Sequence, residues 1–145
     1  MIGLNGSPAN LSILSACAPN RKAPVTANDG FFSELQQVSF SVHARDYLIA
    51  AGDSNRRVGL SDAPTQVHGK VGLGHRIDNG KRLANYSLTN HLVVINTIFQ
   101  HKPNHLLMWH SNDGVTNALI DFILVHQLWI SSVMESSSYN GAGEG

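Results

Sequence analysis

The sequence contains little charge, few aromatic residues and no excess of either sign. Only 14% of its 145 residues are charged, which is well below the roughly 25% of an ordinary domain, and 7% are aromatic. Such a composition indicates modest solubility, or a surface that belongs against another molecule. Lys+Arg and Asp+Glu number 10 each, so no net field draws the chain to nucleic acid or to a membrane.

Cysteine and long apolar runs are also scarce. The single cysteine, Cys17, excludes an internal disulfide framework and fits a reducing compartment. No apolar stretch approaches the roughly 20 residues of a membrane span, and the first residues show no basic region followed by an apolar one, as a secretory signal would. We therefore expect an intracellular protein, with the nucleus among its candidate compartments.

The chain contains enough hydrophobic residues to form the core of one domain. Hydrophobic residues make up 42% of the chain, and its length corresponds to about one domain with a buried core. We expect a loop over residues 1–10, which are rich in Gly, Asn, Ser and Pro. The domain should follow over 11–130, and a flexible Ser/Gly-rich tail over 131–145.

The regular elements expected within the domain alternate between strands and helices. Alternating or β-branched apolar runs predict strands, at 11–16, 48–53, 92–98, 106–109 and 118–125. A helix is expected after the capping residues Asn28 or Asp29, with an apolar stripe at helical spacing made of Phe31, Leu35, Val38 and Val42.

A second, shorter helix over 81–90 should turn Leu83, Tyr86 and Ser87 inward. Strands that alternate with two helices in this way are typical of a layered α+β fold.

The run Leu48–Asn55 is the centre of the functional argument. An apolar strand ends there in glycine and presents Asp53 and Asn55. Alternate residues of a strand point to the same side, so the carboxylate and the amide should project together, where they could be held over a reacting centre. A strand followed by an ordinary turn explains the same residues, because Asp and Asn both favour turns.

Asp121 is the second acidic candidate. It lies within the apolar run 119–124, where a charge is costly unless it is paired. One interpretation places it on a solvent-facing side of a strand, opposite Ile120, Phe122 and Leu124. The other makes it a carboxylate that orients a histidine, as in a catalytic triad.

Histidines and basic residues give weaker signals. The spacings of His101, His105 and His110 match no zinc pattern, so exposed loop histidines are preferred and no metal ligand is assigned. Six of the ten basic residues fall within 56–82. This span is either a solvated loop or a surface for phosphate backbones. Its basic residues are Arg56, Arg57, Lys70, Arg76, Lys81 and Arg82.

Five short motifs occur in a specific order along the chain. They are Cys17-Ala18-Pro19-Asn20, Gly52-Asp53-Ser54-Asn55, Asp78-Asn79-Gly80-Lys81-Arg82-Leu83, Trp109-His110-Ser111-Asn112-Asp113-Gly114 and Ile120-Asp121-Phe122-Ile123-Leu124. In this order they resemble the endonuclease/exonuclease/phosphatase superfamily, which has the DNase I-like fold. More narrowly, they resemble the endonuclease domain of LINE-type retrotransposons and the related craniofacial development protein 2-like sequences.

The resemblance implies a fold, a cofactor and a set of site residues. It implies an α+β, four-layer sandwich of two sheets flanked by helices, and a Mg²⁺-dependent phosphodiesterase that acts on DNA. Asp53 would activate or orient the attacking water, with Asn55 beside it at the scissile phosphate. Asp121 would pair with a catalytic histidine. The resemblance also implies contacts to the substrate, from Asn20, Arg56 and Arg57.

The sequence also departs from the pattern of this superfamily. The N-terminal strands with the metal-binding Glu, and the Ser-Asp-His motif expected after Trp129, are missing. Cys17 replaces a usual Tyr, and Ser54 replaces a bulky apolar residue. These departures predict a partial sandwich that lacks its N-terminal and C-terminal strands and has little or no activity. One alternative is a non-enzymatic module that binds nucleic acid or protein. Another is a chain that does not fold stably alone, because a partial sheet leaves unpaired edges and apolar faces.

Overall fold

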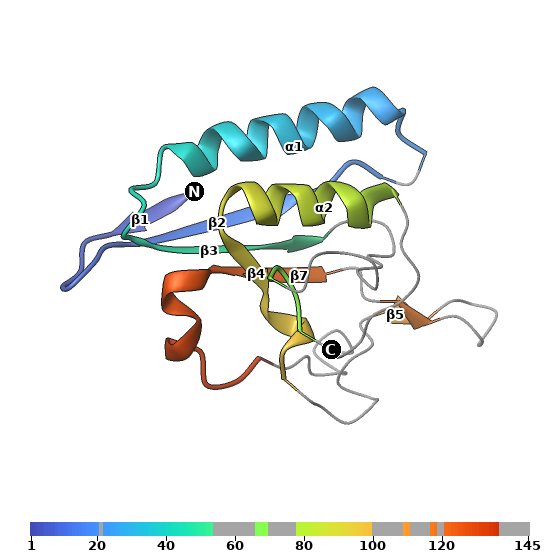
Figure 1. Cartoon of the computed structure of the whole chain (residues 1–145). Helices are drawn as coiled ribbons and strands as arrows, with labels where there is room; N and C mark the ends of the chain where they lie inside the picture. The colour runs from blue at the N-terminus through green and yellow to red at the C-terminus, as the bar shows by residue number, and fades with distance from the viewer. Residues whose placement is uncertain are drawn as a thin grey trace, which may run out of the picture.

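A computed structural model describes residues 1–20, 22–53, 66–69, 78–99, 109–110, 117–118 and 121–136. Its main element is a five-stranded sheet in the order β1-β2-β3-β7-β4 (Figure 1). The strands are β1 (Ile2–Leu4), β2 (Leu11–Cys17), β3 (Tyr47–Asp53), β4 (Leu92–Val94) and β7 (Asp121–His126). Only β2 and β3 are parallel, and the other neighbouring pairs are antiparallel.

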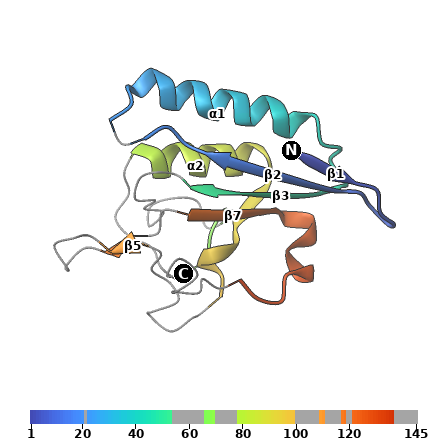
Figure 2. The same cartoon turned by 180° about the vertical axis from the view of Figure 1, so that it is seen from behind.

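Two helices cover one face of this sheet. Helix α1 (Val25–Phe40) joins β2 to β3, as a parallel pair requires, and α2 (Asp78–Thr89) precedes β4. Figures 1 and 2 show both helices on the same side of the sheet, with their first turns at the end where β3 finishes. Among the described residues, no helix is both long and apolar enough to cross a bilayer.

The core lies between the helices and the sheet. One row of cross-strand partners faces the helices and is almost fully buried, and it consists of Leu14, Ala50, Leu124 and Val94. Helix α2 buries Leu83, Tyr86 and Ser87 against it, which confirms the inward positions expected from the sequence. This packing fixes the order of the strands, and with it the position of the residues at their ends.

Smaller elements complete the described chain. They are the 3₁₀ segments η1 (Ile95–Thr97) and η3 (Gln127–Ser132) and the two-stranded pair β5 (Trp109–His110) and β6 (Asn117–Ala118). Segment η3 lies on the side of the sheet away from the helices (Figure 1). There the ring of Trp129 stacks on Tyr47 with 3.9 Å between centroids.

Helix α1 begins earlier than the sequence predicted. Pro24 occupies the N-cap position with φ −64°, and the helix starts at Val25 rather than after Asn28 or Asp29. Proline suits a helix start because its fixed φ matches the helix and it needs no amide partner. Asn28 therefore lies inside the helix and is 1% exposed.

The apolar stripe of α1 is also partly different from the prediction. Leu35 is buried as expected, whereas Val38 is 38% exposed, and Phe32 and Ser39 take the inner positions. Phe31 and Val42 pack at the margin of the core. A buried hydroxyl that hydrogen-bonds Tyr86 at 2.5 Å allows Ser39 to replace an apolar residue on this face.

Three further elements differ from the sequence-based expectation. Ile2–Leu4, in the expected loop, form β1 and pair with β2. The expected strand at 92–98 ends at Val94, where η1 begins. The described residues of 118–125 belong to two strands, β6 and β7, in different sheets. The expected strand residues 106–108 lie outside the described residues, and so do residues 111–114 of the fourth motif. The predicted α+β class is confirmed.

Candidate active site at one end of the sheet

Asp53 and Asp121 lie side by side at the end of the sheet. Asp53 is the last residue of β3 and Asp121 the first of β7, and the antiparallel register makes them direct partners. Partners of this kind have Cβ atoms roughly 4.5–5.5 Å apart and project to the same face. Phe122 and Leu124 point into the core, so both carboxylates project from the face away from the helices. Asp121 thus lies opposite its apolar neighbours, as the alternation predicted.

Burial and a neighbouring charge both act on the carboxyl group of Asp121. Partial burial raises the pKa of Asp121 above its usual range, and the negative charge of Asp53 raises the pKa further. Two carboxylates placed this way favour a bound cation or a shared proton, because either one removes the repulsion. The arrangement is therefore suited to binding a divalent cation together with an anionic substrate group.

Replacing Asp121 with asparagine should stabilise the fold at neutral pH. The raised pKa means that the folded state binds more protons than the unfolded state, so wild-type stability falls as pH rises from about 3.9 through the raised value. The gain should be below about 1 kcal/mol, because the side chain is partly exposed, and should vanish at lower pH. Urea unfolding of both proteins across this pH range measures the gain, and an equal difference at every pH would contradict the raised pKa of Asp121.

A close backbone approach fixes the position of Asp53. A Cβ built on Gly52 would lie 1.6 Å from the carbonyl oxygen of Ala16, so the parallel strands β2 and β3 could not approach this closely with any side chain there. The amide of Ala18 donates to the carbonyl oxygen of Asp53 at 2.8 Å. In the same register Cys17 is the partner of Asp53, and its exposed thiol extends the row of the two acids on the outer face.

Of the other predicted site residues, the structure describes Asn20 alone. Asn20 is exposed and forms the turn before α1, where its Oδ1 accepts from the amide of Lys22 at 3.0 Å. It therefore lies beyond the same end of β2. Asn55, Arg56 and Arg57 lie outside the described residues. Sequence reasoning did not find the pairing of Cys17 with Asp53, because strand register depends on contacts between distant segments.

The donor set at this end of the sheet fits Mg²⁺. This ion is usually held by one or two carboxylates, with water and substrate phosphates completing its shell. Asp53 and Asp121 would supply those carboxylates, and the ion would offset both the burial of the Asp121 carboxylate and its repulsion by Asp53, which together raise the pKa of Asp121. In the part of the chain that the structure describes, no group of three or more His, Cys, Asp or Glu side chains converges on a metal position.

Comparisons with known proteins agree with this architecture. The chain is 34% identical over 137 residues to craniofacial development protein 2 of Tragulus javanicus, and 33% identical over 141 residues to that of Bos taurus. These matches span 94% and 97% of the chain but 24% of each relative. The chain therefore covers about a quarter of the length of the curated relatives it matches. No protein-family model matches it.

A solved structure shows the same fold. The endonuclease domain of TRAS1, a telomere-specific non-LTR retrotransposon, superposes with a TM-score of 0.59 at 12% identity. The match covers 89% of this chain and 50% of the solved chain. The chain therefore has the DNase I-like fold, in part, and its sequence is similar to one segment of craniofacial development protein 2.

Proposed function

We propose that this chain is part of a Mg²⁺-dependent endonuclease domain of retrotransposon type that acts on DNA. The observation that carries the proposal is the cross-strand pairing of Asp53 with Asp121 at the end of the sheet. The likeness to a retrotransposon endonuclease domain supports the choice of phosphodiester chemistry.

Each candidate residue has a role in this proposal. Asp53 and Asp121 hold the ion between them. Asp53 also orients the attacking water, and Asp121 also orients a histidine. Asn55 lies at the scissile phosphate, and Asn20, Arg56 and Arg57 contact the DNA backbone. A bound Mg²⁺ supplies charge that stabilises the phosphate as it is attacked. The partial burial of Asp121 strengthens such electrostatic interactions relative to bulk water.

We further propose that the chain alone cleaves DNA very slowly or not at all. The described end of the sheet offers two carboxylates, and no third metal-binding side chain converges on them within the described ranges. Catalytic groups that act as a unit are strongly non-additive, and removing members of one costs several orders of magnitude in rate. We expect the loss of other site residues to reduce Mg²⁺ binding less than it reduces the rate of DNA cleavage.

Mg²⁺ binding and plasmid nicking test the two parts separately. Mg²⁺ should raise the Tm of the wild-type chain, because it binds the folded carboxylate pair and not the unfolded chain. Asp53→Asn and Asp121→Asn should each remove this shift. Glu34→Gln, which neutralises an exposed acid on α1, should retain it. Nicking of supercoiled or abasic-site DNA should stay near background.

The possible outcomes differ clearly. A Tm that does not respond to Mg²⁺ would remove the basis for an endonuclease site at these residues. Salt-dependent DNA affinity without that response, lost on neutralising Arg56 and Arg57, would favour the non-enzymatic binding module. Strong Mg²⁺-dependent nicking that is abolished in Asp53→Ala would retain the endonuclease and contradict the low activity.

A further inference from the structure

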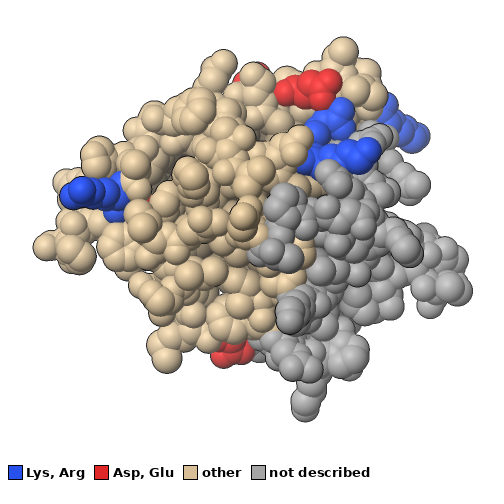
Figure 3. Space-filling model, viewed as in Figure 1, with Lys and Arg blue, Asp and Glu red and all other residues tan. Residues whose placement is uncertain are grey.

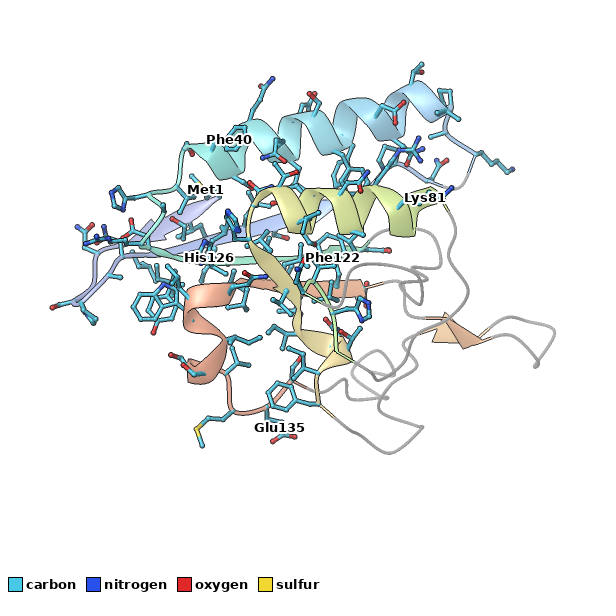
Figure 4. All side chains as sticks on the ribbon, viewed as in Figure 1. Met1, Phe40, Lys81, Phe122, His126 and Glu135 are labelled. Atoms are coloured by element: carbon cyan, nitrogen blue, oxygen red, sulfur yellow. The ribbon has the colours of Figure 1, made fainter. Side chains whose placement is uncertain are left out.

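Positive charge gathers at the same end of the molecule as the carboxylate pair. The described residues include four lysines and arginines, and Figure 3 shows Lys and Arg side chains gathered at the end of the molecule where α1 and α2 begin. By their positions in the chain, three of the four belong to this end: Lys22 lies just before α1, and Lys81 and Arg82 lie early in α2, where Figure 4 marks Lys81. The fourth, Arg45, precedes β3 and lies at the opposite end.

An ion pair joins the two helices inside this group. The Nε of Arg82 lies 2.7 Å from Oδ1 of Asp29 on α1. The Arg82 side chain is 21% exposed and that of Asp29 is 59% exposed, so the pair is reachable from solvent. The contact uses one of the five donors of the guanidinium, and a carboxylate at this position competes with any other anion for the same group.

The positive group and the carboxylates share one end of the sheet. Helix α1 starts a few residues after β2 ends, and the amide of Ala18 in that loop bonds the carbonyl oxygen of Asp53. Figure 1 shows the end of β3 and the first turns of both helices on the same side of the molecule. A polyanion that crosses this end would meet the basic side chains above the sheet and the acids below it.

We propose that Lys22, Lys81 and Arg82 form a phosphate-binding surface for a nucleic-acid strand, and that Asp29 weakens it by holding Arg82. The nucleic-acid class of the ligand rests on the proposed function, whereas the surface and its restraint rest on the charges and the ion pair. Phosphate contacts supply sequence-independent affinity that falls with salt, by a slope of about 0.9 per phosphate neutralised. Asp29 thus lowers the affinity of this surface for the phosphate backbone of a nucleic-acid strand.

Fluorescence anisotropy with a short labelled DNA duplex, in EDTA and at several salt concentrations, tests the surface. Asp29→Asn should tighten binding about fivefold and steepen the salt slope by about one. Glu34→Gln makes the same change in net charge on the same helix, away from Arg82, and should tighten binding much less. Lys81→Gln and Arg82→Gln should each weaken binding about fivefold, whereas Arg45→Gln should change it little.

A double variant isolates the role of Arg82. If Asp29 acts by holding Arg82, then in an Arg82→Gln background Asp29→Asn should tighten binding no more than Glu34→Gln does. Equal gains in both backgrounds, equal effects of Asp29→Asn and Glu34→Gln, or equal losses from Lys81→Gln and Arg45→Gln would each overturn the proposal. Thermal melts of every variant should show that the fold is retained, because an exposed ion pair contributes at most about 1 kcal/mol.

The outcome is independent of the carboxylate site. EDTA removes divalent ions, so binding that depends on Lys81 and Arg82 would stand even if Mg²⁺ leaves the Tm unchanged and no nicking occurs. Conversely, a Mg²⁺ shift that needs Asp53, together with DNA binding indifferent to Lys81 and Arg82, would retain the endonuclease site and exclude this surface.

Discussion

Gly52→Ala should destabilise the protein by about 3 kcal/mol or more, and should disrupt the carboxylate pair with it. The added Cβ would lie 1.6 Å from the carbonyl oxygen of Ala16, and no side-chain movement can relieve a clash with backbone. Strands β2 and β3 must separate, which breaks the register that places Asp53 beside Cys17 and Asp121. Urea unfolding measures the loss, and the Mg²⁺ shift in Tm reports on the site.

Gly30→Ala is the matched control for this change. Gly30 is exposed within α1, and a Cβ built on it meets nothing within 4 Å. Alanine is favoured over glycine in a helix by about 1 kcal/mol, so this variant should be stabilised. A Gly52→Ala protein as stable as the wild type would show that the two strands do not need this close approach.

Phe122→Ala should cost about 3–5 kcal/mol, the largest effect we expect from a single truncation in the core. Phe122 is 1% exposed and lies directly across from Gly52, in the strand that presents Asp121. Removing its ring leaves a cavity between the sheet and the helices, and the neighbouring side chains can close such a cavity only in part. Urea unfolding should show a lower midpoint with an unchanged slope.

Phe40→Ala is the matched control, because it makes the same change of phenylalanine to alanine at an exposed position. Phe40 ends α1 with its side chain 69% exposed, so its truncation should change stability by no more than about 0.5 kcal/mol. Similar losses for Phe40→Ala and Phe122→Ala would contradict the core as described. A loss confined to Phe122→Ala would show that the strand carrying Asp121 is anchored by the residue next to it.

The periodic spacing of apolar residues predicted the elements that have one apolar face and one polar face. Helix α2 has Leu83 and Tyr86 on one face and exposed residues such as Asn85 on the other, so its inner positions could be predicted. Strand β3 was found because its apolar run is bounded by turn residues. In contrast, β1 was missed because Ile2 and Leu4 flank a glycine among polar residues, and only pairing with β2 makes it a strand.

The candidate site could be predicted only in part for the same reason. The sequence indicated that Asp53 ends a strand and that Asp121 points away from an apolar core. It could not show that the two are partners, because β7 pairs with a strand far away in the chain. The ion pair of Asp29 with Arg82 is likewise a tertiary contact between two helices, and no spacing within either helix predicts it.

The place of β7 in the sheet has a consequence for synthesis on the ribosome. Both β3 and β4 pair with β7, yet both are translated before it. A nascent chain that has emerged only as far as β4 therefore exposes an edge of β3 with unsatisfied amides and carbonyls. Such an edge is a template for pairing with other chains. The interval before β7 emerges is thus the period in which this protein is most exposed to misassembly.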